Sequence, residues 1–273
     1  MCEWCGLRIT IPQNVRLEYR SAKGEAARFI ALAAELVRLK VDLIVTRGTP
    51  AARAAKEATS RIPIVMAAIG EPLDTGVVAS LARPGGNVTG LSAFVTELAG
   101  KRVELMKELL PALTRVGFFN NMSNPAIPPQ WQEAQRAARS LAIQAELLDV
   151  RSKADILRAF AKAAHSRVDG LLVGIDAITQ QHRGLIVSLA GRQQLPTIYA
   201  SREYVEARGL MSYGVSYPDL YRRAARTADK IFKGANPRTN DHRRILSRAR
   251  RRCRSRLRDI KDEAGLKSFS PAA

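Results

Sequence analysis

The sequence predicts an α/β protein with two halves, each built on a parallel β-sheet. Between residues 15 and 233, short β-branched or apolar runs alternate with longer stretches of helical periodicity. Strand, helix and strand in this order require a parallel sheet, because parallel neighbours need a crossover connection. The polar, proline-containing run NNMSNPAIPPQ at 120–130 separates the two halves.

Proline and glycine mark the ends of the helices predicted in the first half. Pro50 occupies a first helical turn, where a missing N–H costs nothing, and Pro111 ends a later helix. The turn at 83–86 contains two glycines, which suit positive φ angles. The predicted strands are 15–19, 42–46, 62–66, 87–91 and 114–120, and the predicted helices are 25–39, 50–58, 75–82 and 96–110.

The second half repeats the alternation, and we place the domains at 14–120 and 121–237, followed by an arginine-rich tail at 238–273. The predicted helices are 130–141, 153–165, 179–192, 203–207 and 217–232, and the predicted strands are 144–150, 168–173, 197–199 and 210–213.

The tail carries a disproportionate share of the formal net charge of +19, because it has twelve Lys and Arg against four Asp and Glu. Such a block suits either a phosphate-binding arm or a solvated extension, disordered or helical. We favour the extension, because its charge density cannot pack into a core and no aromatic side chains are interleaved for base stacking. Nucleic acid is therefore not an expected partner.

Several functional classes lack support in the sequence. The apolar runs are far shorter than the roughly 20 residues of a membrane span. Cys2 and Cys5 have C-x-x-C spacing without a second ligand pair, and no histidines have metal-ligand spacing. No nucleophile, base or phosphate-loop pattern is present. We expect no catalytic residues, no metal site and no cofactor.

Small, polar and acidic residues follow the carboxyl ends of the predicted strands, where doubly wound sheets bind ligands. The loop after residue 46 leads into a helix N-terminus, which favours an anionic group, although ordinary N-capping by Thr49 explains that residue equally well. Turn formation is likewise an alternative for each of the other loops. Together they suit a cleft for a small zwitterion or acid. The candidate ligand-binding residues are Thr46, Gly48, Thr49, Gly70, Glu71, Asn124, Asp176, Tyr199 and Glu203.

Several separated motifs resemble a known family. The segments IPIVMAAIGEP, GVVASLARPGGNVTGLS, ELAGKRVELMKELLP, VDGLLVG, LPTIYASREYVEARGLMSYG and YRRAARTADKIFKGANP resemble the substrate-binding proteins of ABC transporters, in the branch of tryptophan- and tyrosine-binding components. The resemblance covers about 14–237. It implies a type I periplasmic-binding fold, in which two Rossmann-like lobes close by a hinge on a small organic solute, such as an amino acid, for delivery to a permease.

The resemblance also assigns the candidate residues to lobes. Thr46, Gly48, Thr49, Gly70 and Glu71 would come from the first lobe. Asn124, Asp176 and the 199–203 segment would come from the second, with hinge crossings near 120–124 and 199–217.

The chain departs from the family pattern at both ends. Members begin with an export signal, a strand and a helix ahead of the segment that matches residue 14, and they continue past GANP with a further strand and an apolar segment. The sequence therefore predicts an incomplete first lobe, a truncated copy, and a tail foreign to the fold. The family location is periplasmic, whereas the chain as written carries no signal peptide and would stay in the cytoplasm. A cytoplasmic ligand-sensing regulator, with a basic tail that contacts nucleic acid, is the alternative.

Overall fold

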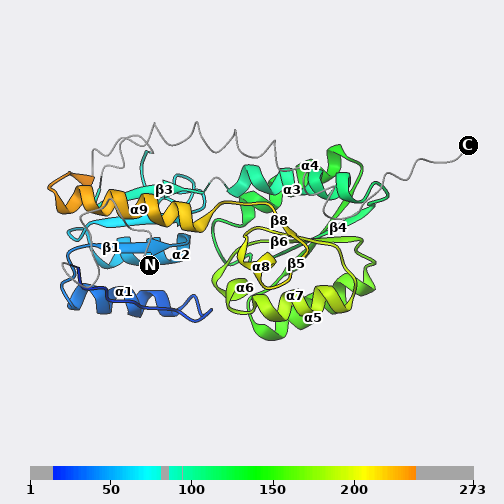
Figure 1. The fold of residues 1–273 in the computed structure, drawn as a ribbon, viewed down its shortest axis with the longest axis horizontal. Coiled ribbons are helices and arrows are strands. Elements are labelled where there is room, and N and C mark those ends of the chain that lie inside the picture. The colour runs from blue at the N-terminus through cyan, green and yellow to red at the C-terminus, as the bar shows by residue number, and fades with distance from the viewer. Residues whose placement is uncertain (1–14, 81–85, 94, 238–273) are drawn as a thin grey trace, which may run out of the picture. The chain divides into compact units, whose positions relative to one another are not determined.

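Two parallel β-sheets organise the protein (Figure 1). The computed structural model describes residues 15–80, 86–93 and 95–237. The three cysteines lie outside the described residues. So does the arginine-rich tail, which the sequence predicts to be an extension foreign to the fold.

The first sheet has three parallel strands in the order β1-β2-β3. Its central strand is buried along its whole length, and the core beneath it includes Ile64, Met66 and Ala52. Among the described residues, β1 pairs only with β2, and Val45 on β1 is 48% exposed. The elements are α1 (Arg28–Arg38), β1 (Ile44–Arg47), α2 (Thr49–Ala58), β2 (Ile64–Ile69) and β3 (Val88–Ser92).

The second sheet has five parallel strands in the order β5-β4-β6-β7-β8. Its core joins strands to helices through contacts such as Phe119 against Phe160, whose ring centroids are 5.5 Å apart. The remaining elements of the described chain, of which the last returns to the first sheet, are α3 (Val95–Leu109), β4 (Arg115–Asn120), α4 (Pro128–Ser140), β5 (Gln144–Asp149), α5 (Lys153–His165), β6 (Gly170–Val173), α6 (Ala177–Gln181), α7 (Arg183–Arg192), β7 (Thr197–Tyr199), α8 (Glu203–Glu206), β8 (Met211–Ser212) and α9 (Tyr217–Phe232).

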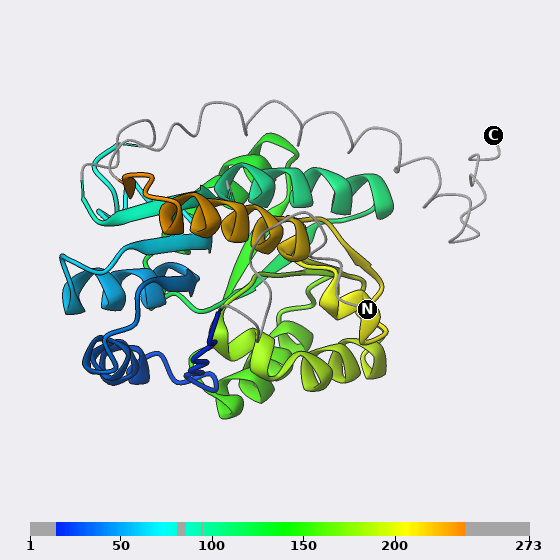
Figure 2. The same ribbon diagram turned by 60° about the vertical axis from the view of Figure 1, so that its left-hand side comes forward.

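The chain passes between the two sheets twice. After β3 it enters α3, which packs along α4 beside the second sheet (Figure 2). After β8 it returns as α9, which packs on β2 of the first sheet, where Ala224 contacts Val65 and Ala67. The division therefore differs from a boundary at residue 120: β4, expected in the first half, pairs with β5 and β6, and α9, expected in the second, covers the first sheet.

Three predicted elements differ in the structure. Residues 15–19 form no regular secondary structure and pair with no described strand, so the predicted strand is absent. Of the predicted 75–82 helix, the described part is a turn in which the Val77 N–H donates to the Pro72 carbonyl. The 179–192 helix is two helices, because the Asp176 cap starts α6 early and α6 ends at His182.

Candidate functional site

A pocket of about 230 Å³ lies where the helices beside the first sheet face loops of the second sheet. One wall is mostly apolar and comes from α2 and from the start of α1. The other wall is polar and comes from the loop after β4 and from the cap of α6. The lining residues are Ala26, Phe29, Ile30, Pro50, Arg53, Ala54 and Glu57 on the first side, and Asn121, Ser123, Asn124, Pro125 and Asp176 on the second.

The polar wall is held together by the carboxylate of Asp176, which is 9% exposed. Its Oδ1 accepts from Asn121 Nδ2 at 3.0 Å and from the Ile178 N–H at 3.1 Å, and its Oδ2 accepts from Asn124 Nδ2 at 2.9 Å. An ionised carboxylate offers about four acceptor positions, so three hydrogen bonds leave room for one more donor. The polar wall therefore holds a buried carboxylate in a fixed orientation, and this carboxylate can accept one more hydrogen bond.

The same aspartate begins α6. Its side chain accepts from the backbone of the helix while Thr179 Oγ1 accepts from the Asp176 N–H at 2.9 Å, which makes a capping box. Asn121 in turn fixes its own loop, because Asn121 Oδ1 accepts from both the backbone N–H and the hydroxyl of Ser123. Asn124 Oδ1 accepts from the Ala126 N–H. Both side-chain amides are thus used in hydrogen bonds within the protein. They orient Asp176 and are not free to bind a solute.

The candidates after β1 and β2 form a separate small network. Thr49 Oγ1 donates to the Gly70 carbonyl at 2.8 Å, so this hydroxyl joins two loops and does not cap its own helix. Gly48 is the N-cap of α2 with φ +81°, and its N–H donates to the Ala68 carbonyl. Thr46 Oγ1 is buried and has no hydrogen-bond partner among the described residues. None of these residues lines the pocket.

Glu71 is the next residue along that loop. It has φ +47°, and its carbonyl accepts from the N–H and the hydroxyl of Thr75. It therefore shapes a turn and does not line the pocket.

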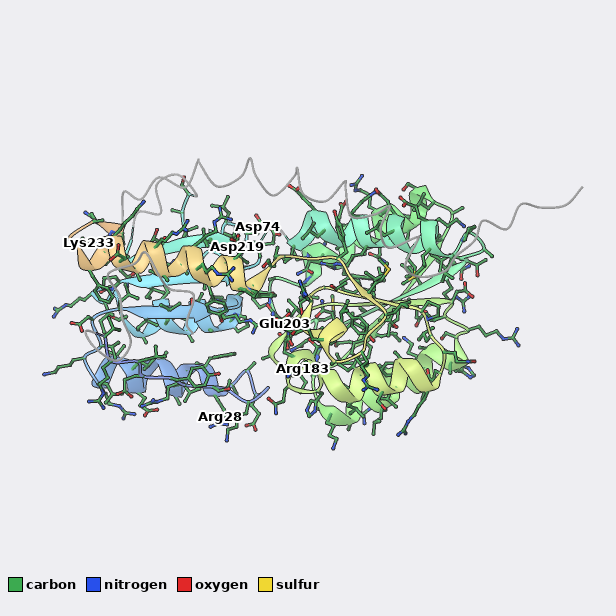
Figure 3. The ribbon with its side chains drawn as sticks, in the orientation of Figure 1. Arg28, Asp74, Arg183, Glu203, Asp219 and Lys233 are labelled. Atoms are coloured by element: carbon green, nitrogen blue, oxygen red, sulfur yellow. The ribbon has the colours of Figure 1, made fainter. Side chains whose placement is uncertain are left out.

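Tyr199 and Glu203 also lie away from the pocket. The Tyr199 side chain is 1% exposed and stacks on Tyr204 with ring centroids 4.7 Å apart, within the core of the second sheet. Burial raises the pKa of Tyr199 to about 12, and a hydrogen bond with Thr197 opposes this shift. Glu203 begins α8 and is half-buried (Figure 3). Of the nine candidates, the pocket thus brings together Asn124 and Asp176.

Several lining residues were missed by the sequence analysis. Asn121 and Ser123 belong to the polar NNMSN run, which signals a strand-end loop without showing which side chains face a pocket. Phe29 lies in the predicted 25–39 helix, where core packing is the ordinary expectation for an aromatic side chain. Arg53 and Glu57 read as a solvated i,i+4 pair on α2, and their closest atoms are 3.9 Å apart.

Two arginines lie near Tyr217 at the start of α9. The Arg47 guanidinium lies 4.2 Å above the Tyr217 ring centroid, a cation–π arrangement. Arg102 is fully buried in α3, and its Nε donates to the Tyr213 carbonyl at 2.9 Å. Burial lowers the pKa of Arg102 to about 10. This side chain links α3 to the segment through which the chain returns to the first sheet.

The described residues contain no cluster of His, Cys, Asp and Glu that could hold a metal ion. A search of the same residues for a helix long and apolar enough to cross a membrane finds none.

The chain was compared with known proteins by sequence and by structure. A tyrosine-binding protein of Clostridioides difficile (strain R20291) is 27% identical over 221 residues, covering 81% of this chain and 63% of that protein. An ABC domain from Streptococcus pneumoniae in complex with L-Trp has a TM-score of 0.77 at 28% identity, covering 84% of this chain and 77% of that one. A conserved domain protein from Vibrio cholerae has a TM-score of 0.78 at 27% identity, with the same coverage of 84% and 77%.

The comparisons support the predicted α/β fold with parallel sheets, because these neighbours match most of the described chain. This chain spans slightly under two thirds of the length of the tyrosine-binding protein. A family model described as "ABC transporter substrate binding protein" matches residues 7–248. The protein belongs to the family of ABC transporter substrate-binding proteins.

Proposed function

We propose that this protein is the solute-binding component of an ABC importer and that it holds an amino acid with an aromatic side chain. The observation that carries the proposal is the pocket, with its apolar wall facing a wall built on one buried carboxylate. A solute with an apolar body and a cationic group matches these two walls.

The carboxylate of Asp176 supports recognition of an ammonium group. Hydrogen bonds between ionised partners are about twice as strong as those between neutral groups, and this carboxylate has one acceptor position left after its three bonds. Asn121 and Asn124 hold it in place, so little reorganisation is needed when the solute binds.

The opposite wall supports an apolar side chain of limited size. Phe29, Pro50 and Ala54 supply apolar surface, and Arg53 adds a guanidinium that suits a carboxylate. The volume of about 230 Å³ lies below the roughly 300–1,000 Å³ of pockets for drug-sized ligands. A single amino acid fits this scale better than a peptide or an oligosaccharide.

The relatives favour an aromatic amino acid over other zwitterions. One curated relative is named a tyrosine-binding protein, and one solved relative is described in complex with L-Trp. The family match also favours transport over a cytoplasmic regulator. From its family, we expect the partner of this protein to be a permease and its location to be the periplasm.

The passage of the chain between the two sheets supports hinge closure as the expected motion. The two sheets and their helices would be the lobes, and the segments after β3 and after β8 would be the hinge. The second segment lies within the 199–217 range expected from the sequence, whereas the first lies well before the expected crossing near 120–124.

Isothermal titration with matched ligands tests the proposal. L-tryptophan and L-tyrosine should bind, whereas indole-3-propionate, which lacks the ammonium group, should bind at least about tenfold more weakly. Phe29→Ala should weaken tryptophan binding about tenfold through lost apolar contact, while Phe232→Ala, on an exposed side chain of α9, should leave it unchanged. Equal affinity for tryptophan and indole-3-propionate would refute the role of the carboxylate.

A further inference from the structure

The turn at residues 21–26, just before α1, crosses from the first sheet's side of the pocket to α6 of the second. It reverses the chain tightly, with φ +49° at Lys23 and +85° at Gly24, and the Glu25 N–H donates to the Ala22 carbonyl at 3.0 Å. Ala22 is 4% exposed, although it lies in a turn. Ala22 is therefore packed against other parts of the molecule, whereas Ser21, Lys23, Glu25 and Ala26 are exposed.

Gly24 brings the turn into contact with α6. A Cβ placed on Gly24 would lie 3.3 Å from Gln181 Cβ and 3.5 Å from Ile178 Cδ1, so the two segments are in van der Waals contact. A Cβ at Gly24 would require Gln181 to shift by only a few tenths of an ångström.

This contact lies next to the pocket in the sequence of both walls. Ala26, two residues after Gly24, lines the apolar wall, and Asp176, two residues before Ile178, lines the polar wall. The turn and α6 are thus continuous with opposite walls of the pocket. Separating them would widen the gap between those walls.

The turn is held more firmly to its own side than to α6. Arg20, at its start, donates to Glu35 of α1 at 2.8 Å. Between the turn and α6, the described residues show apolar contact and no hydrogen bond. The contact with α6 can therefore open without leaving a buried polar group unpaired.

We propose that the 21–26 turn is a latch that closes the pocket against α6 and controls the rate at which solute enters and leaves. This proposal rests on the proposed function for the solute, but the contact with α6 can be tested without any solute. Lids of this kind commonly set exchange rates in ligand-binding proteins.

An engineered disulfide across the latch tests the proposal. In the full chain with Cys2, Cys5 and Cys253 replaced by Ser, the pair Gly24→Cys and Gln181→Cys places the two Cβ atoms close to the separation of about 3.5–4.5 Å that a disulfide needs. The pair should oxidise rapidly. Crosslinking with L-tryptophan bound should slow its dissociation at least about tenfold, and reduction should restore the rate.

Single-cysteine variants under the same oxidation serve as controls and should exchange tryptophan normally. A pair that stays reduced, or a complete crosslink that leaves tryptophan dissociation unchanged, would overturn the latch. If even the reduced protein binds no tryptophan or tyrosine, the proposed function fails, and the crosslinking rate alone then decides whether the latch contact exists.

The cysteine variant could fail to fold, because Gly24 has φ +85° and a side chain there is strained. A second pair of variants tests the latch without changing Gly24. Ile178→Ala loosens the contact and should speed tryptophan dissociation several-fold. Ile186→Ala is the matched control, because Ile186 is buried in the core of the second sheet away from the pocket. Ile186→Ala should lower the melting temperature without changing the dissociation rate. Equal dissociation rates for these two variants would also count against the latch.

Discussion

Replacing Asp176 by Asn should destabilise the protein, although the two side chains have nearly the same shape. The Asp176 carboxylate accepts three hydrogen bonds, from Asn121 Nδ2, Asn124 Nδ2 and the Ile178 N–H. In Asp176→Asn one oxygen becomes an NH₂ group, which then faces a neighbouring N–H donor. One hydrogen bond is lost outright, and the others become bonds between neutral groups.

The magnitude follows from these bonds. Hydrogen bonds to charged groups contribute about 1.5–3 kcal/mol, against about 0.5–1.5 kcal/mol for neutral pairs. Losing one bond and weakening the rest should reduce the free energy of unfolding by roughly 3 kcal/mol. The helix cap adds little to this loss, because Asn caps helices about as well as Asp. For a chain of this size the melting temperature should fall by about 6–12 °C.

Thermal unfolding followed by far-ultraviolet circular dichroism measures the effect. Asp74→Asn, at an exposed aspartate, is the control and should change the melting temperature by less than about 1–2 °C. An Asp176→Asn protein that melts within this margin of the parent would refute the assignment of Asp176 as the centre of the polar wall.

Three further predictions concern stability. Gly90→Ala should prevent the first sheet from folding, because its Cβ would lie 2.2 Å from the Met66 carbonyl oxygen at φ +139°, whereas Gly184→Ala, with nothing within 4 Å, should stabilise α7 by about 0.5–1 kcal/mol in urea unfolding. Burial raises the pKa of Tyr204 above the ordinary value near 10. The stability that this shift contributes is present below pH 10 and is lost as the pH rises beyond it, so Tyr204→Phe should flatten the loss seen in urea titrations between about pH 9 and 11. Arg102→Met removes a buried charge that has no carboxylate partner among the described residues, so its melting temperature should equal or exceed that of the parent, and a large decrease would contradict this account.

Local pattern predicted most elements, because helix periodicity, caps and β-branched runs act over short stretches of chain. The bounds of α5, β7 and α9 agree with the sequence prediction to the residue. The 15–19 strand failed for a non-local reason. Its β-branched and aromatic residues suit a strand, but a strand also needs a hydrogen-bonded neighbour.

The sheet to which an element belongs was harder to predict than its type. Residues 114–120 form a strand as expected, yet the chain has already left the first sheet when it reaches them. No local feature marks that departure, because α3 has ordinary helical periodicity whichever sheet it covers.

The candidate site was predicted in part for a related reason. Asn124 and Asp176 lie in the loops that follow β4 and β6, and both line the pocket. Tyr199 ends its strand at the corresponding place but turns into the core, where Tyr204 stacks on it. Which way the last residue of a strand faces depends on the pleat and on its neighbours, and the sequence does not encode either one locally.

Among the residues that the structure describes, no strand pairs with the outer side of β1, and this makes protein concentration a variable in every measurement on this molecule. Amide and carbonyl groups along that side can template a strand from another copy, so self-association should increase as solutions become more concentrated. Solute affinities and melting temperatures should therefore be compared at one dilute concentration. A lysine in place of Val45 would discourage such growth without touching the pocket.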